Sequence, residues 1–441
     1  MVKVWGLLIR SITGYDEAMD KNEAPWFRPA DPLPRDARIA VIGGGIGGLC
    51  AATALAEAGA TVRLYDRSET SGGGASGTPA AIVQPRAFVE DSVAARFHAD
   101  AYRRAVALYD RLSTPTGSMW LARGLLALGR DDDGAARHRA FVGSGLLAED
   151  DVKWLDAAEA ARSVGVAVGA PGAWFRRAGC LDTGRLCVAL AATLDVQFGV
   201  AIETLEREGG GWRLLGAERR ELGVADAVVV AAGVDTNALV ADLDLGAKRG
   251  QVSLVPVSEA SRSMSGVLTF GGYLTPAVVA GGHVLGATFD SAATDDTELR
   301  AADDDRNLQG LADRVPALRG LLPLSSAQGW AGVRATTADS LPVVGPVSDG
   351  VFYREAYETI RHGPGHRRFP PAKYPPGLYV IAGFGSRGFL TAPYAGQILA
   401  AAMLGEAVAV DGRLLSALHP ARFLVRALRR GKAGGTVPPA D

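Results

Sequence analysis

Short apolar runs separated by glycines and by amphipathic segments dominate the pattern of this chain. The apolar run Arg38–Ile42 leads directly into glycines, and the alanine-rich segment 49–58 that follows predicts a helix. A second apolar run, Thr61–Tyr65, predicts the next strand. Strand, helix and strand in this order predict a βαβ unit.

The rest of the pattern predicts further elements of both kinds. Residues 97–112 repeat apolar positions at helical spacing, and the apolar run Asp226–Gly233 suits a strand at the edge of a parallel sheet. The runs 250–256, 267–276 and 283–289 predict an antiparallel sheet. Further strands are predicted at 201–205, 212–215, 341–345 and 378–383, with a helix at 393–404.

A chain of 441 residues predicts two domains, and the order of the elements makes them alternate along the chain. We expect an α/β fold in which a Rossmann-like nucleotide-binding domain is interwoven with an α+β substrate domain built on an antiparallel sheet. The expected division is an extended lead-in at 1–36, a nucleotide-binding domain at 37–86, 172–245 and 330–430, a substrate domain at 87–171 and 246–329, and a flexible basic tail at 431–441.

Composition narrows the class of protein. With 48% hydrophobic and 21% charged residues and a net charge of −2, the chain has no overall attraction to nucleic acid or to a membrane. No apolar run approaches the ~20 residues of a membrane span. The cysteines lack C-x-x-C spacing, and His283, His362 and His366 lack acidic or cysteine partners at ligand spacing. We expect a cytoplasmic protein without a metal site.

The glycines after the first strand carry the clearest chemistry. Gly43, Gly45 and Gly48 follow the spacing G-x-G-x-x-G, with Ile46 among them, and this spacing places a pyrophosphate at a helix N-terminus. Asp66 ends the second strand, where an acid accepts hydrogen bonds from ribose hydroxyls. An acid here favours FAD or NAD over NADP, and the alternative is an ordinary glycine turn.

Basic residues gather in the C-terminal quarter of the chain. No acid occurs between Glu358 and Glu406, and the last thirty residues have Asp441 as their one acid. These arginines and lysine either contact nucleic-acid phosphates or form a solvated tail. The residues concerned are Arg422, Arg426, Arg429, Arg430 and Lys432.

Several short blocks, taken in order, resemble the flavin amine oxidases of the D-amino-acid oxidase, glycine oxidase and sarcosine oxidase type. More narrowly, the chain resembles the oxidoreductase half of the MnmC family, which modifies the wobble uridine of tRNA. The blocks are Ala24–Phe27, Gly43–Gly48, Gly74–Gly77, Asp226–Gly233, Gly250–Val252, Gly272–Pro276, Trp330–Arg334, Asp339–Gly345, Gly383–Gly388, Ala392–Pro393 and Leu418–Arg422.

The resemblance implies a specific oxidation at a CH–NH bond. Non-covalent FAD would accept electrons while the carboxymethyl group is removed from 5-carboxymethylaminomethyl-(2-thio)uridine in tRNA, leaving the 5-aminomethyl nucleoside and glyoxylate. The residues before Ala24 are too few for the methyltransferase domain that MnmC proteins commonly carry. We therefore expect a monomer that performs the oxidative step, with the anticodon region of tRNA and a separate methyltransferase as partners.

The same resemblance implies roles for single residues. Arg334 would anchor the substrate carboxylate, or else be a salt-bridged surface arginine, and Tyr273 would add a hydroxyl, or else be a core aromatic. Arg387 would stabilise the reduced flavin, hold the substrate carboxylate or contact an RNA phosphate. The remaining residues expected to bind the cofactor are Ser76, Gly77, Gly233, Gly385, Ser386 and Gly388.

One block departs from the family, and three other functions stay open. The loop after Gly77 reads Thr78–Ala81, where the family often has Asn-Arg-Gln-Gly, so flavin or substrate contacts there would differ. A small-molecule oxidase of glycine, sarcosine or a D-amino acid would use the same Arg334. An NAD-linked dehydrogenase fits the glycine loop but not Gly383–Gly388, and a non-catalytic nucleotide-binding protein would carry no flavin.

Overall fold

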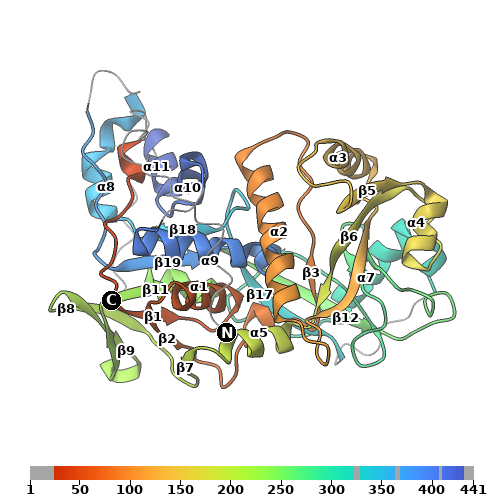
Figure 1. Cartoon of the computed structure of the whole chain (residues 1–441), viewed down its shortest axis with the longest axis horizontal. Helices are drawn as coiled ribbons and strands as arrows, with labels where there is room; N and C mark the ends of the chain where they lie inside the picture. Colours follow the sequence, from red (N-terminus) through yellow and green to blue (C-terminus); the bar gives the residue numbers. More distant parts are fainter. Residues whose placement is uncertain (1–23, 321–327, 363–367, 407–409, 432–441) are drawn as a thin grey trace.

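The computed structural model describes residues 24–320, 328–362, 368–406 and 410–431. A mostly parallel sheet lies at the centre of one of its two lobes, the lobe that contains β1 and β19 (Figure 1). Its strand order is β18-β19-β11-β1-β2-β7, and only β18 runs antiparallel to its neighbour. The strands are β1 (Arg38–Ile42), β2 (Thr61–Tyr65), β7 (Asp195–Gln197), β11 (Ala227–Val230), β18 (Val343–Pro346) and β19 (Leu378–Ala382).

Strand β11 corrects one expectation from the sequence. It lies between β1 and β19, in the interior of the sheet and not at its edge. All four of its residues are buried, because both faces of the sheet are covered and a polar side chain would find no solvent on either side. A short meander of β8 (Thr204–Glu208), β9 (Gly211–Leu215) and β10 (Glu221–Ala225) precedes it.

Two apolar helices cover one face of this sheet. Helix α1 (Ile46–Glu57) packs against α9 (Gly388–Leu404), and α9 also packs against α2 (Val93–Leu112) (Figure 1). Helix α9 begins five residues before the predicted start at Pro393, which lies inside it. Proline cannot donate to the carbonyl of Phe389, and the buried Tyr109 hydroxyl of α2 donates to that carbonyl instead.

A larger, mainly antiparallel sheet forms the other lobe of the molecule. Its order is β16-β12-β15-β14-β13-β4-β6-β3, with β17 paired to β12 and β5 paired to β6. The strands are β3 (Ala81–Val83), β4 (Trp120–Ala127), β5 (Val152–Leu155), β6 (Gly172–Leu181), β12 (Gly246–Val255), β13 (Val267–Thr269), β14 (Tyr273–Leu274), β15 (His283–Gly286), β16 (Asp290–Ser291) and β17 (Trp330–Thr336).

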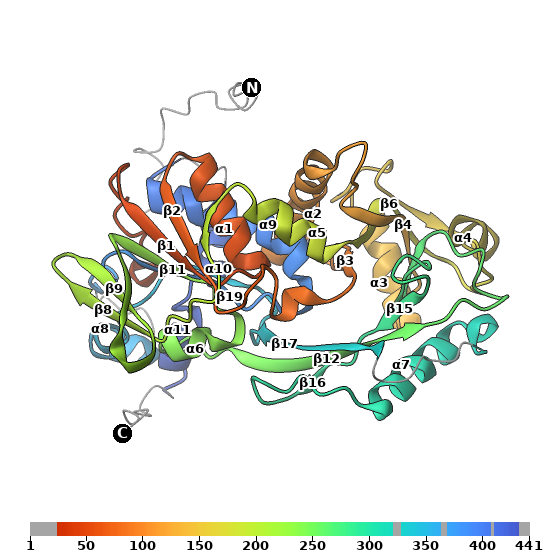
Figure 2. The ribbon, with the colours of Figure 1, turned by 90° about the horizontal axis from the view of Figure 1, so that it is seen from below.

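Strands β12 and β17 lie side by side and extend from the larger sheet toward the first (Figure 2). The expected division of the chain assigns 172–245 and 330–430 to the nucleotide-binding domain, yet β6 and β17 at the starts of these segments pair in the larger sheet. The interwoven α/β fold class itself is confirmed. Further helices are α3 (Asp132–Gly143), α4 (Ala157–Val164), α5 (Thr183–Ala191), α6 (Thr236–Leu239), α7 (Ala301–Arg314), α8 (Gly350–Ala356), α10 (Gly412–Leu418) and α11 (Arg422–Arg429).

Among the described residues, no helix is both long enough and apolar enough to cross a membrane. The same residues contain no group of three or more histidine, cysteine or acidic side chains placed to hold a metal ion. His366 lies outside the described residues, as do the start of the expected lead-in and nearly all of the expected tail.

Candidate functional site

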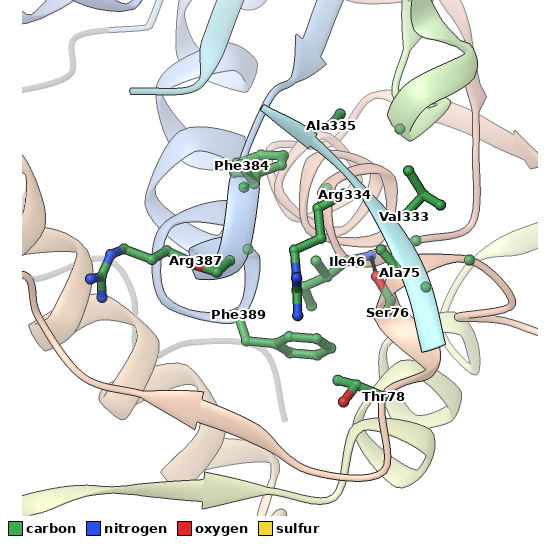
Figure 3. Close-up of a pocket in the computed structure, with 18 of the residues that line it drawn as sticks. Ile46, Ala75, Ser76, Thr78, Val333, Arg334, Ala335, Phe384, Arg387 and Phe389 are labelled. Atoms are coloured by element: carbon green, nitrogen blue, oxygen red, sulfur yellow. Dashed lines mark hydrogen bonds between the residues drawn. The ribbon is translucent and has the colours of Figure 1, made fainter. Parts of the chain in front are cut away.

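A cavity of about 1440 Å³ lies where the two sheets meet. The glycine loop after β1 and the segment 73–89 line one side, and β17 with the loop 383–389 lines another (Figure 3). Residues far apart in the sequence, among them Gly45, Tyr273, Arg334 and Arg387, therefore face one space.

The glycines after β1 are required by close backbone approaches. Gly43 has φ +116°, and a Cβ there would overlap the Ala231 carbonyl oxygen. A Cβ on Gly48 would overlap the Gly43 carbonyl oxygen, so Gly48 packs the helix against the loop and does not line the cavity. Gly45 lines the cavity at the start of α1, where the helix dipole favours a phosphate.

Two side chains hold the glycine loop in place. The Asp66 carboxylate accepts hydrogen bonds from the backbone N–H groups of Gly44 and, at 2.7 Å, of Ser68. The Ser76 hydroxyl accepts a hydrogen bond of 2.9 Å from the Ile46 N–H at the first turn of α1. Asp66 and Ser76 thus shape the loop as well as lining the cavity.

The cavity fits a dinucleotide. Its volume exceeds the roughly 300–1,000 Å³ that is typical of small-ligand sites. The helix N-terminus at Gly45 would hold the pyrophosphate and Asp66 would face the adenosine ribose, while Gly233, with φ +60°, lines the same cavity. Gly77 does not line the cavity; a Cβ there would lie 2.9 Å from the Gly72 carbonyl oxygen, which keeps the segment 72–77 folded on itself.

Arg334 projects from β17 into the cavity, between Phe384 and Phe389 in the view of Figure 3. Its Nη1 donates to the Thr288 carbonyl oxygen at 3.3 Å, and its guanidinium lies 5.8 Å from the Phe289 ring. Burial lowers the pKa of Arg334 from its usual 12.5. In the described part of the chain, no carboxylate forms an ion pair with this guanidinium.

Tyr273, on β14, lies near Arg334 and lines the same cavity. Burial raises the pKa of its hydroxyl to about 12, while the positive charge of Arg334 acts in the opposite direction. The hydroxyl donates to the Ala80 carbonyl oxygen at 3.4 Å. At neutral pH Tyr273 therefore keeps its proton and offers a hydrogen bond, not a base.

The loop Gly385–Arg387 leads into α9, as the sequence predicted, and Gly385, Ser386 and Gly388 line the cavity. Arg387 points away from Arg334 (Figure 3) and donates to the Gln84 carbonyl oxygen at 3.4 Å. Burial, together with the neighbouring Arg86, lowers the pKa of Arg387 to about 10. The two arginines therefore do not converge on one carboxylate.

The C-terminal arginines differ in their surroundings, and the expectation for Arg422 is corrected. Arg422 is 6% exposed, and its Nε and Nη2 each donate to the Asp339 carboxylate at 2.9 Å, so it is not free to contact a phosphate. Arg426 is exposed and lies 3.3 Å from the same carboxylate. Arg429 lies over the Trp26 ring, Arg430 is exposed, and Lys432 lies outside the described residues.

The family model described as FAD dependent oxidoreductase (DAO) matches residues 38–402. This chain belongs to the DAO family of FAD-dependent oxidoreductases. The sequence expectation of an FAD enzyme is thereby confirmed, and the NAD-linked and non-catalytic alternatives are excluded. When bound in this DAO-family cavity, FAD accepts the electrons that a substrate C–H bond gives up.

Three curated relatives of this DAO-family chain have the name tRNA 5-methylaminomethyl-2-thiouridine biosynthesis bifunctional protein MnmC. The protein from Magnetococcus marinus is 33% identical over 93% of this chain and 62% of its own length. The proteins from Pseudomonas aeruginosa (strain UCBPP-PA14) and Ralstonia nicotianae are 33% and 34% identical and are covered over 63% and 67% of their lengths. The chain thus spans about two thirds or less of these relatives, at 62–67%.

Solved structures support the DAO fold of the chain. Glycine oxidase from Geobacillus kaustophilus superimposes with a TM-score of 0.66 at 23% identity, over 88% of this chain and 99% of its own. Iminodiacetate oxidase from Chelativorans sp. BNC1 gives a TM-score of 0.64 at 22% identity, over 85% and 97%.

The sequence did not identify several residues that line the cavity or make room for the side chains that line it. Gly250 was noted only as part of a block, yet a Cβ at this position would overlap the Arg334 guanidinium, so a glycine on β12 makes room for that side chain. The role of Gly250 depends on the pairing of β12 with β17, two strands far apart in the sequence, which places Gly250 opposite Gly332. Arg86, Arg130 and Arg137 also line the cavity and lie in no motif.

Proposed function

We propose that this chain catalyses the FAD-dependent oxidative removal of the carboxymethyl group from 5-carboxymethylaminomethyl-(2-thio)uridine at the wobble position of tRNA, giving 5-aminomethyl-(2-thio)uridine and glyoxylate. The observation that carries the proposal is the identity of 33% over 93% of the chain with proteins named for the biosynthesis of this nucleoside family. The cavity supports it, because the substrate is an N-substituted glycine with a carboxylate to be held.

Arg334 supplies the anchor for that carboxylate. Its guanidinium faces the cavity without an acidic partner in the described part of the chain, so the carboxylate of a bound substrate would provide the missing negative charge. Two parallel N–H···O bonds would also fix the plane of the carboxylate. Tyr273, which keeps its proton, would add one hydrogen bond from β14.

One oxidation consumes water and the oxidised cofactor, and an external electron acceptor must reoxidise the cofactor before the next turnover. The neutral secondary amine loses a hydride from the carbon between nitrogen and carboxylate, and a proton from nitrogen, to give an imine. Water adds to the imine carbon, and the C–N bond breaks to release glyoxylate and the primary amine on the nucleoside. The contribution of the chain is positioning, since a carboxylate fixed at Arg334 determines which C–H bond faces the cofactor.

The partners follow from this chemistry. For a tRNA substrate we propose a cytoplasmic enzyme that acts on the anticodon region, and we propose that it acts as a monomer. The printed name of the relatives contains methylaminomethyl, so a methyltransferase activity would have to complete the pathway on the aminomethyl product.

The test is incubation of the flavin-loaded enzyme with tRNA that carries the carboxymethylaminomethyl group, followed by mass spectrometry of the digested nucleosides. We expect loss of the carboxymethyl mass, glyoxylate in equal amount, and neither product with Arg334→Ala. The control is Arg139→Ala, because Arg139 is exposed on α3 and does not line the cavity. Turnover of free glycine, sarcosine or iminodiacetate with untouched tRNA would reject the proposal in favour of a small-molecule oxidase.

A further inference from the structure

Four arginines outside the expected motifs of the C-terminal tail line one region of the cavity. They come from the loop after β3, from the loop before α3, from α3 itself, and from the loop before α9. We call them the basic cluster, and they are Arg86, Arg130, Arg137 and Arg387. Arg86, Arg130 and Arg137 are exposed, whereas Arg387 is half-buried.

Electrostatic interactions connect Arg86, Arg137 and Arg387 with one another or with one neighbouring histidine, and Arg130 lines the same cavity. Arg86 lowers the pKa of Arg387, which shows that the two positive charges lie within electrostatic range of each other. His138 lies beside them: burial first, then Arg137 and Arg387, lower its pKa to about 4, so this histidine is neutral at pH 7. Like charges held together in this way repel one another, and a bound anion would relieve that repulsion.

Acidic side chains do not neutralise the basic cluster in the described part of the chain. Among those residues, no ion pair involves Arg86, Arg130 or Arg387, and Arg137 has only Asp131 at 4.0 Å. Asp131 begins α3 by accepting from the Gly134 N–H, and neither it nor the two acids after it line the cavity. The acids that do line it are Asp66, Glu203, Asp235 and Asp295.

The position of the basic cluster separates it from the cofactor phosphates. The pyrophosphate position is at the glycine loop, where α1 begins. Arg130 instead packs against Gly271, where a Cβ would lie 3.0 Å from its Cγ, two residues before Tyr273. Arg387 reaches Gln84, on the segment that follows β3. The basic cluster therefore borders the substrate end of the cavity.

We infer that the basic cluster binds the backbone phosphates that flank the target nucleoside when its base enters the cavity. This inference rests on the proposed function. The occupant is single-stranded RNA of the anticodon loop. Its target base would enter the cavity, and the phosphates on either side of that nucleoside would bind the exposed arginines beside the cavity. The cluster would thereby distinguish a nucleoside carried by RNA from a free N-substituted glycine of the same local chemistry.

The experiment compares two substrates with the flavin-loaded enzyme: modified tRNA, and the free nucleoside 5-carboxymethylaminomethyluridine, which has no phosphate. In Arg130→Ala/Arg137→Ala we expect the ratio of kcat/KM for tRNA to kcat/KM for the nucleoside to fall at least about tenfold. The dependence of log K for tRNA binding on log salt should become shallower by about 0.7 for each phosphate that the variant no longer neutralises. Arg139→Ala, on the same helix but outside the cavity, should change neither quantity.

The outcomes separate this inference from the proposed function. If wild-type enzyme converts modified tRNA but the substrate ratio and the salt dependence are the same in the double variant, the basic cluster does not bind phosphates and the inference fails alone. If wild-type enzyme leaves modified tRNA untouched, the proposed function fails. If the double variant instead loses turnover of the nucleoside and of tRNA in the same proportion, the cluster serves the reacting group, and the phosphate assignment is wrong.

Discussion

Arg334 is half-buried at the cavity wall and Arg422 is buried in the fold, and the two differ in what balances their charge. Arg422 forms two hydrogen bonds of 2.9 Å to Asp339 and a third to the Leu341 carbonyl oxygen. Arg334 has one long hydrogen bond, to a backbone carbonyl, and in the described part of the chain no acid. The first guanidinium joins parts of the fold, whereas the second lines a cavity.

This difference gives a rule for interpreting buried charges in the chain. Burying a charge without a partner is unfavourable, so such a group persists where a ligand completes it. The acid that completes Arg422 is part of the protein, and we propose that the acid that completes Arg334 arrives with the substrate. Substitutions at the two positions should therefore separate stability from turnover.

The largest effects are expected when Arg422 and Arg334 are each replaced by alanine in separate variants. Arg422→Ala leaves the Asp339 carboxylate without its main partner and should lower the free energy of unfolding by about 3 kcal/mol. Arg334→Ala should leave that free energy within about 1 kcal/mol of wild type, yet lower kcat/KM by at least about 10²-fold through loss of two charge-assisted hydrogen bonds. Urea unfolding and steady-state kinetics measure the two quantities.

The proposed difference between the two arginines would be contradicted if Arg334→Ala lost stability and Arg422→Ala lost turnover. A strongly destabilised Arg334→Ala protein would mean that this guanidinium has a structural role. A stable Arg422→Ala protein with impaired turnover would place Arg422 in the reaction, contrary to its burial against Asp339.

A smaller effect is expected when the Arg334 side chain is displaced but kept. In Gly250→Ala the new methyl group would overlap the guanidinium and push it from its position. A displacement of about 1 Å at a reacting group can lower turnover by up to about 10²-fold, and because the guanidinium is kept we expect a smaller loss than in Arg334→Ala. Flavin absorbance should stay at the wild-type level, because Gly250 lies on β12 and not at the glycine loop.

Gly310→Ala is the matched control for Gly250→Ala. Gly310 lies in α7, and a Cβ there would have no heavy atom within 4 Å outside its own helix, so we expect unchanged turnover and slightly higher stability. If Gly250→Ala were as active as wild type, Arg334 would not need its present position, and the anchor assignment would be lost.

The sequence predicted the parts of the fold and site that depend on local patterns. Strand β2 coincides with the predicted run Thr61–Tyr65, and Gly43 and Gly48 are required by the contacts that their spacing implied. These features are local because a tight turn needs its glycines at fixed positions relative to one strand and one helix.

The parts that the sequence did not predict depend on distant partners. Arg422 looked like the other basic residues near the C-terminus, and only the fold brings Asp339 to it across 83 positions. Likewise, Arg86, Arg130 and Arg137 belong to no motif, and only the meeting of the two sheets places them in one cavity with Arg387. Pairings of this kind leave no periodic signal in one sequence.

The smallest effect is expected at two buried tyrosines of α2, one with a hydrogen-bond partner in the fold and one without. The Tyr109 hydroxyl donates to the Phe389 carbonyl, which Pro393 leaves without its helical donor, whereas the Tyr102 hydroxyl has no partner in the described part of the chain. Tyr109→Phe should therefore lower the free energy of unfolding by about 1–3 kcal/mol. Tyr102→Phe should leave it unchanged or raise it. Urea unfolding of both variants decides the matter, and equal losses would show that the hydrogen bond to α9 does not determine what the Tyr109 hydroxyl contributes to stability.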